Sequence, residues 1–362
     1  MKFKLKYETG ELIETIDNQD LIELLSLNKN KIDIIADKWN KVKKMIHDYE
    51  FIYTSPNKKK NISNILPISR SYFKLKEIIK DYNIKLDNLT IFSMAEAPGG
   101  FIQELLENNI NKIYANTLKI NDPSVPRWNI NLLNNKKIDF YTGIRENGDL
   151  TDLNNLLSYI KYIGKSSIDL VTGDGGFDYS NDYNKQEINS LPLIYSEILL
   201  ALNVLKPGGI FICKIFDFFL KETINLIYIL TLLFEIVYIH KPKFSRLSNS
   251  EKYLVCLNYK GYDKNINNLL IRYYKTSKLS LKIDSNFNEK INKFTNEYIN
   301  KQINQINKGV KIINDNIKEQ IPSELQINKA IEWCNHYDIE INTKCYYISG
   351  HSSHDNFRIG AE

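Results

Sequence analysis

The sequence predicts an α/β protein built on a mainly parallel, doubly wound sheet. Between about residues 66 and 262, short apolar runs with strand character alternate with longer segments of helical periodicity. This alternation is typical of parallel sheets covered by helices, because parallel strands need crossover connections. The last two apolar runs are joined by a loop without a helix, which predicts an antiparallel final strand.

Local patterns give the individual elements of this region. The expected strands are short runs rich in β-branched and aromatic residues, at 90–95, 112–116, 138–142, 167–172, 209–215, 234–240 and 252–258. The expected helices lie between them, at 68–81, 100–108, 151–163, 185–205 and 220–232.

The flanking segments, 1–65 and 263–362, are expected to add helices. In the first, an apolar stripe at helical spacing predicts one amphipathic helical stretch, through Ile32, Ile35, Trp39, Val42 and Ile46. In the second, apolar residues alternate spacings of four and three, at Ile299, Ile303, Ile306, Val310, Ile313 and Ile317. This stripe predicts a long helix that ends before Pro322 and packs either on its own domain or on a partner helix.

The overall composition constrains the class of protein only loosely. Lys and Arg total 48 against 43 for Asp and Glu, a formal net charge of +5, which permits a nucleic-acid partner without requiring one. The four cysteines show no framework spacing, so reduced thiols of an intracellular protein are expected. The N-terminus lacks the apolar run of a signal peptide, and Asn225 and Glu235 interrupt the most apolar stretch, so no membrane span is expected.

A turn with two glycines directly follows the first strand of the alternating region and begins a helix. It reads Ala97-Pro98-Gly99-Gly100-Phe101. Glycines let a ligand approach the backbone, and a helix N-terminus offers N–H groups to a carboxylate. Open α/β sheets bind ligands at this edge. The turn lacks the G-x-G-x-x-G pattern, which disfavours a dinucleotide-dependent dehydrogenase.

Charged residues mark three further positions near strand ends. Asp149 follows the third strand of this region and Asp174 the fourth; each is either a capping acid or a ligand contact. Lys214 lies inside the apolar strand at 209–215. Burying an ammonium is costly unless it is paired or its pKa falls, so Lys214 is either a strand-end lysine that reaches solvent or a base.

Over about 66–260 the sequence resembles the FtsJ-like ribose 2′-O-methyltransferases, and most closely the cap-specific mRNA enzymes of eukaryotes and large DNA viruses. The order and spacing of several motifs carry the resemblance. They are Ser69-Arg70-Ser71-Tyr72-Phe73-Lys74-Leu75, Ala97-Pro98-Gly99-Gly100-Phe101, Gly148-Asp149-Leu150, Asp174-Gly175-Gly176-Phe177-Asp178, Asn184-Lys185-Gln186-Glu187, Lys206-Pro207-Gly208-Gly209 with Cys213-Lys214, and Lys241-Pro242 with Ser245-Arg246 and Asn249-Ser250-Glu251-Lys252-Tyr253.

The resemblance implies a Rossmann-like class I fold that uses S-adenosylmethionine as its cofactor, with no metal. It implies a catalytic tetrad of Lys74, Asp174, Lys214 and Glu251. It implies cofactor contacts from Glu96, Ala97, Pro98, Gly99, Gly100, Phe101, Asp149, Leu150 and Asp174. It implies substrate contacts from Arg70, Asn184, Lys185, Gln186, Ser245, Arg246 and Ser248.

Two positions depart from the family pattern. An acid common near the end of the first strand is replaced by Ser93, so Glu96 is expected to substitute for it. No acid follows the second strand, where residues 116–119 stand instead.

The chemistry implied by the resemblance needs in-line placement and a base, because a ribose 2′-hydroxyl has a high pKa. Lys214 would accept the proton, which requires its pKa to fall; burial and Lys74 would lower it, while Asp174 and Glu251 would oppose that.

The expected substrate is the cap-proximal nucleotide of mRNA. Ribosomal or transfer RNA is the alternative substrate, and a catalytically silent RNA-binding scaffold is the alternative class of protein. Lys58-Lys59-Lys60 form either a solvated loop or contacts to RNA phosphates. A C-terminal group has zinc-ligand residue types but matches no tight zinc spacing: Cys334, His336, Cys345, His351 and His354.

Overall fold

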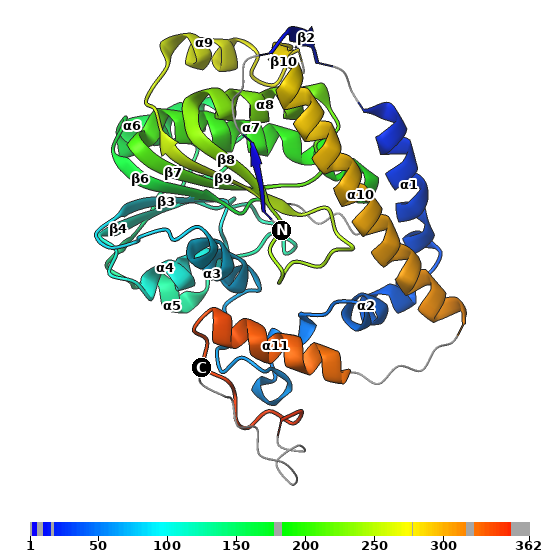
Figure 1. Ribbon diagram of the computed structural model, residues 1–362. Coiled ribbons are helices and arrows are strands. Elements are labelled where there is room, and N and C mark those ends of the chain that lie inside the picture. The colour runs from blue at the N-terminus through cyan, green and yellow to red at the C-terminus, as the bar shows by residue number, and fades with distance from the viewer. Residues whose placement is uncertain are drawn as a thin grey trace, which may run out of the picture.

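An eight-stranded sheet forms the centre of the computed structural model, which describes residues 2–5, 10–15, 18–176, 183–276, 278–315 and 322–348 (Figure 1). The strands lie in the order β1-β8-β9-β7-β6-β3-β4-β5. Their bounds are β1 (Lys2–Leu5), β3 (Thr90–Met94), β4 (Lys112–Ala115), β5 (Ile138–Phe140), β6 (Ile168–Gly173), β7 (Leu205–Ile215), β8 (Phe234–His240) and β9 (Lys252–Tyr259). All seven expected strands are confirmed, and β1 is an addition that pairs antiparallel with β8.

The predicted mixture of parallel and antiparallel strands is also confirmed. β3, β4, β5, β6 and β7 form parallel pairs, whereas β9 inserts between β7 and β8 and runs antiparallel to both. Its register pairs Lys214 with Tyr253 and Ile215 with Lys252. The start of β9 therefore lies beside the carboxyl end of β7.

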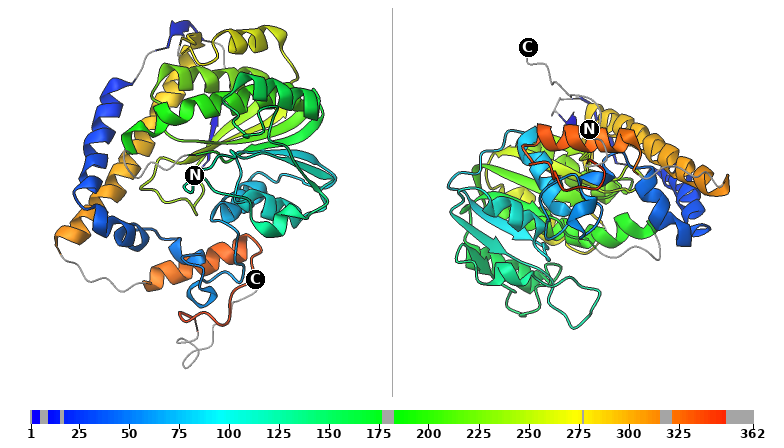
Figure 2. Two further views of the ribbon diagram at one scale, coloured as in Figure 1. Left: turned by 180° about the vertical axis from the view of Figure 1, so that it is seen from behind. Right: turned by 90° about the horizontal axis from the view of Figure 1, so that it is seen from below.

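Helices cover both faces of the sheet (Figures 1 and 2). On one face lie α6 (Leu153–Ile163), α7 (Gln186–Val204) and α8 (Lys221–Leu233); on the other lie α3 (Ser71–Asp81), α4 (Gly100–Leu106) and α5 (Ile130–Leu133). Short elements complete this region: η1 (Glu50–Ile52), η2 (Lys58–Lys60), η3 (Tyr183–Lys185) and α9 (Lys264–Arg272). Each face has its own buried apolar cluster, as expected for parallel strands covered on both sides.

The N-terminal segment corrects one prediction. The expected single helical stretch is two helices, α1 (Gln19–Asp33) and α2 (Ala36–Met45). The break exposes Ile34, which is 85% exposed, and lets both helices pack around the same long C-terminal helix. The predicted stripe is nevertheless the packed face, because Ile32 and Trp39 are buried against Ile306 of that helix.

The long C-terminal helix is α10 (Ser285–Asn314), followed by α11 (Glu324–His336). The expected stripe on α10 packs on α1 and α2, so the chain's own helices cover it; Ile317 lies outside the described residues. A small sheet of β2 (Leu12–Glu14) and β10 (Lys282–Asp284) joins the two terminal segments. A protein partner at this stripe stays an untested prediction.

The terminal segments share apolar clusters with the central region. Phe287, Ile291 and Phe294 of α10 belong to the same buried cluster as α7 and α8. Trp333 of α11 packs with Phe73 of α3. The predicted division of the chain into a central domain and two flanking segments, with boundaries at residues 65 and 262, stays a prediction. Among the helices in the described part of the chain, none is long and apolar enough to span a membrane.

Candidate active site

A cavity of about 720 Å³ opens over the carboxyl ends of the parallel strands. Residues after β3, β4, β5 and β6 line one side of it, and residues of the terminal helices line another. The lining from the strand ends includes Ala95, Ala97, Pro98, Asn116, Thr117, Leu118, Gly148, Asp149, Leu150, Thr151, Asp174 and Gly176. The cavity therefore lies where open α/β sheets bind their ligands.

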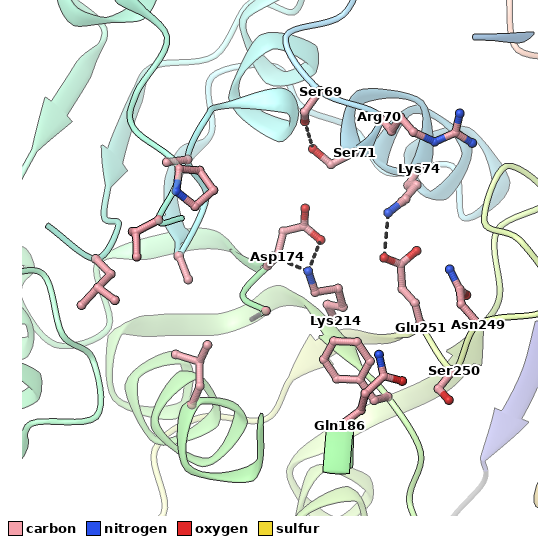
Figure 3. Close-up of a pocket in the computed structure, with 18 of the residues that line it drawn as sticks. Ser69, Arg70, Ser71, Lys74, Asp174, Gln186, Lys214, Asn249, Ser250 and Glu251 are labelled. Carbon is pink, nitrogen blue, oxygen red and sulfur yellow. Dashed lines mark hydrogen bonds and ion pairs between the residues drawn. The ribbon is translucent and has the colours of Figure 1, made fainter. Parts of the chain in front are cut away.

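Four residues of the predicted tetrad come together in this cavity as two ion pairs (Figure 3). Lys74 of α3 donates to Oε2 of Glu251 at 2.7 Å. Lys214 of β7 donates to the backbone carbonyl of Asp174 at 2.6 Å, and its Nζ lies 3.4 Å from Oδ1 of that residue. Their side chains are only 12–14% exposed. Residues separated by up to 177 positions meet because β9 inserts beside β7.

Further hydrogen bonds fix the two acids. The Tyr253 hydroxyl donates to Oδ1 of Asp174 at 2.8 Å, and the Ser245 hydroxyl donates to Oε1 of Glu251 at 2.8 Å. The Lys241 ammonium donates to the Glu251 carbonyl at 2.7 Å. Tyr253 and Lys241 were not among the predicted site residues, although both belong to or adjoin the motifs quoted for the resemblance.

Neighbouring charges shift the pKa of one member of each ion pair. Burial lowers the pKa of Lys214, but Asp174, Glu251 and Glu197 outweigh it and hold that pKa above its ordinary value. Burial raises the pKa of Glu251, but Lys74, Lys214 and Lys241 outweigh it and bring that pKa to about 2. Lys214 is therefore charged at neutral pH in this arrangement, which is opposite to the fall in pKa that was expected of a base; its role as the base stays a prediction.

Two other buried acids stand behind the tetrad. Burial, with the charge of Asp174 adding to it, raises the pKa of Glu96 to about 8. Burial raises the pKa of Glu197 on α7 to about 8 as well, and its Oε2 accepts the Cys213 thiol at 3.3 Å. Both carboxyls are therefore largely protonated at pH 7. Glu197 had no signal in the sequence, because its role depends on how α7 packs under β7.

The glycine turn is arranged differently from the prediction. Glu96 accepts the N–H groups of Phe101 at 2.9 Å and of Ile102 at 3.2 Å, so it occupies two donors of the helix N-terminus from inside. A Cβ at Gly99 would meet Leu132 at 2.2 Å, and one at Gly100 would meet the Ser69 hydroxyl at 2.1 Å.

The turn therefore divides into two parts. Ala97 and Pro98 line the cavity, whereas Glu96, Gly99, Gly100 and Phe101 lie behind them and are absent from its lining.

On the same side, Asp149 and Leu150 line the cavity as predicted. Oδ1 of Asp149 accepts the backbone N–H and the hydroxyl of Thr151, both at 2.8 Å, while Oδ2 has no donor from the described part of the chain. Gly148 has φ of +68°, and a Cβ there would lie 1.8 Å from the Thr117 carbonyl oxygen. Only glycine allows this approach between two loops of the cavity wall.

The predicted substrate residues divide into three groups. Arg70, Gln186, Arg246 and Ser248 line the cavity. Ser245 contacts Glu251 from behind. Asn184 and Lys185 are exposed, and Asn184 donates to Asn30 of α1 at 2.8 Å. Phe177 and Asp178 lie outside the described residues.

Several lining residues were missed by the sequence analysis. They come from the terminal helices: Lys29 and Ile32 of α1, Trp39 and Lys43 of α2, and Gln302 of α10. Conversely, Lys58–Lys60 do not line the cavity; the Lys58 carbonyl accepts from Asn342, and the Lys59 ammonium lies 5.6 Å from the centre of the Tyr346 ring. RNA contact by these lysines stays a prediction.

The C-terminal group with zinc-ligand residue types, where no metal is expected, is only partly described. Cys334 and Cys345 are buried in an apolar cluster with α11, and His351 and His354 lie outside the described residues.

The fold and the cavity together define a Rossmann-like class I methyltransferase. The FtsJ-like methyltransferase family matches residues 67–259, more than half of the chain, and the chain belongs to that family.

Curated relatives include cap-specific mRNA (nucleoside-2′-O-)-methyltransferases. The chain is 33% identical to enzyme 1 of Drosophila melanogaster over 210 residues, which is 56% of this chain and 26% of that protein. It is 37% identical to enzyme 1 of Trypanosoma brucei brucei over 149 residues, or 38% of this chain and 40% of that protein. The chain thus matches less than half the length of these relatives.

Among solved structures, one match is a putative ribosomal RNA methyltransferase from Plasmodium falciparum. It is 26% identical and has a TM-score of 0.40, covering 54% of this chain and 99% of that one.

Proposed function

We propose that this protein transfers a methyl group from S-adenosylmethionine to a ribose 2′-hydroxyl of RNA, at the cap-proximal nucleotide of mRNA. The observation that carries the proposal is the pairing of Lys214 with Asp174 and of Lys74 with Glu251 inside a cavity at the strand ends. Family membership and the names of the relatives support the same activity.

The residues of the cavity wall suit this cofactor. Ala95, Pro98 and Leu150 provide apolar surface, and Oδ2 of Asp149 remains available to accept from an amino group such as that of adenine. When bound, S-adenosylmethionine supplies an electrophilic methyl group on a positively charged sulfur. The chain's own residues have to place the ribose and remove its proton.

In the proposed mechanism Lys214 is the proton acceptor. Asp174 holds its amine through the backbone carbonyl and the carboxylate, and Tyr253 fixes that carboxylate. Lys74, oriented by Glu251, adds a second positive charge that favours a neutral Lys214 and an ionised hydroxyl. The acids therefore fix the geometry and keep Lys214 mostly protonated at neutral pH, so that only its neutral fraction accepts the ribose proton.

The activity is tested by incubating the protein with S-adenosylmethionine and short RNAs, capped and uncapped, followed by nucleoside analysis. We expect a 2′-O-methylated first nucleotide in the capped RNA. Equal methylation of uncapped RNA, ribosomal RNA or transfer RNA would favour the alternative substrate. Cofactor or RNA binding without transfer to any RNA would indicate a silent scaffold.

Replacing Asp149 by alanine is expected to weaken cofactor binding more than RNA binding. The change removes Oδ2 of Asp149, which has no donor from the described part of the chain and can accept from the cofactor, and a hydrogen bond to a group of this kind contributes about 1 kcal/mol or more. Calorimetry measures the cofactor affinity, and Asp152→Ala, whose carboxylate caps α6, is the control. An unchanged cofactor affinity would exclude this role for Asp149.

The rate of transfer is expected to rise with pH through the alkaline range. Lys214 must be neutral to accept a proton, and its pKa is raised, so its reactive fraction grows as the pH approaches that pKa. Replacing Glu197 by glutamine removes one carboxyl that raises this pKa, so the rise should move to lower pH. Glu104→Gln, which changes a buried acid outside this set, should leave the profile of kcat/KM unmoved.

A further inference from the structure

Three cationic side chains surround one buried carboxylate at the edge of the cavity. Glu50 of η1 is fully buried. Arg246 donates to both of its oxygens, from Nε at 2.9 Å and from Nη2 at 2.7 Å, and Nη1 of Arg70 lies 3.5 Å from Oε1. Lys43 of α2 is half-buried beside them and lines the cavity with both arginines.

The charges of this group do not balance. One carboxylate faces three cations, which leaves two positive charges in excess. Burial lowers the pKa of Lys43, and repulsion from Arg246 lowers it further. Burial also brings the pKa of Arg70 down to about 10, with Arg246 adding to the effect. The Lys43 ammonium donates to Oδ1 of Asn40, a neutral amide, and forms no ion pair with the described part of the chain, so its positive charge is not offset by a carboxylate contact.

The two arginines are held in place before any ligand arrives. The bidentate contact to Glu50 fixes Arg246. The Arg70 guanidinium stacks 4.2 Å from the centre of the Phe244 ring. A fixed cationic group loses little conformational entropy on binding an anion, so its excess charge is available to a ligand.

The group adjoins the tetrad on the side of Lys74. Arg70 is the N-cap residue of α3 and lies four positions before Lys74; in Figure 3 it lies beyond Lys74 as seen from Asp174. Ala97 and Pro98 follow β3, whose Met94 carbonyl accepts the backbone N–H of Asp174, so they adjoin the other ion pair. The cationic group therefore lies on the side of the cavity away from the proposed cofactor wall. With the cofactor on its own wall, this is the side that is left for the RNA.

We infer that Lys43, Arg70 and Arg246 form a subsite for a phosphate group of the RNA, held ready by Glu50. The inference rests on the proposed function and assigns to the N-terminal helix α2 a direct role in substrate binding. Two sources offer this phosphate chemistry: the bridge of phosphates at a capped 5′ end, and a phosphodiester within the RNA chain.

The test replaces Lys43 by methionine, which keeps the length of the side chain and suits a helix. We expect about tenfold weaker RNA binding and a logarithmic salt slope that falls by about 0.7, the loss of one contact to single-stranded RNA. Lys44→Met is the matched control, because the Lys44 ammonium donates to the Thr54 carbonyl and does not line the cavity. Thermal unfolding checks that both variants fold.

Binding is measured by fluorescence anisotropy on capped, 5′-triphosphate and 5′-hydroxyl RNAs of one sequence. A loss confined to the first two RNAs assigns the subsite to the 5′ phosphates; an equal loss on all three assigns it to a phosphodiester. Unchanged affinity and salt slope on all three would overturn the subsite. RNA binding is measured independently of methyl transfer. If the unaltered protein transfers no methyl group but Lys43→Met still weakens RNA binding relative to it, the proposed function is refuted and the subsite is not.

Discussion

Replacing Lys214 by methionine is expected to lower the rate of methyl transfer by about 10²–10⁴-fold, the usual contribution of a general base. The change removes the amine that Asp174 positions in the cavity and keeps an apolar side chain of similar length next to Phe216. Transfer of labelled methyl groups to capped RNA at saturating substrate measures the effect. Cofactor affinity, measured by calorimetry, should change little, because Lys214 adjoins Asp174 and not Asp149.

A matched variant separates loss of the base from damage to the strand. Lys206 belongs to the same strand, β7, but pairs with Asp169 at 2.9 Å on the surface and does not line the cavity. Lys206→Met should therefore retain its activity. A Lys214→Met protein with activity within about threefold of the unaltered protein would remove Lys214 from the mechanism.

The positions of seven strands and the direction of the last one could be predicted because they depend on local patterns. Alternation of apolar runs with helical segments gave the parallel strands, and the missing helix before β9 gave its antiparallel direction. The tetrad was implied by the resemblance to the FtsJ-like family, and the catalytic role of its four residues stays a prediction. The strand β1 was not predicted, because four residues of alternating pattern, Lys2–Leu5, are too short to be distinguished from a charged terminus.

The wall formed by the terminal helices could not be predicted. Lys43 and Lys29 belong to no motif, and they reach the cavity only because α1 and α2 turn around α10. Likewise, a glycine in a turn indicates that a neighbouring group approaches the backbone closely, but the sequence does not identify whether that group is a ligand or another part of the chain. At Gly99 the neighbour is the side chain of Leu132. The sign of the Lys214 pKa shift also depends on such distant neighbours, since Glu197 contributes from α7.

A buried charge network joins the terminal helices to the strand that follows Glu251. The carboxylate of Asp217 lies 3.0 Å from the Lys29 ammonium of α1 and 3.3 Å from the Lys252 ammonium of β9. It also accepts the Ser250 hydroxyl at 2.7 Å. These side chains are nearly inaccessible, and burial raises the pKa of Asp217 while the two lysines outweigh it and bring it to about 2.

Replacing Asp217 by asparagine is therefore expected to destabilise the fold by about 3–5 kcal/mol, since it leaves two buried ammonium groups without their carboxylate. Urea unfolding followed by tryptophan fluorescence measures this loss. Glu297→Gln, which breaks an exposed pair with Lys301 on α10, should cost less than about 1 kcal/mol.

The pH dependence gives a second test of the same network. The folded-state pKa of Asp217 lies below its ordinary value of 3.8, so its contribution is complete above that value and disappears as the pH falls toward about 2. The difference in stability between the unaltered protein and Asp217→Asn should therefore shrink over this range. A double variant that also carries Lys29→Met should recover part of the loss at neutral pH, because it removes one of the two buried cations that have lost the Asp217 carboxylate. The prediction is contradicted if the free energy of unfolding of Asp217→Asn lies within about 1 kcal/mol of that of the unaltered protein at neutral pH. The lysines would then be deprotonated or bound to other partners, and Asp217 would not hold the terminal helix α1 to the active site.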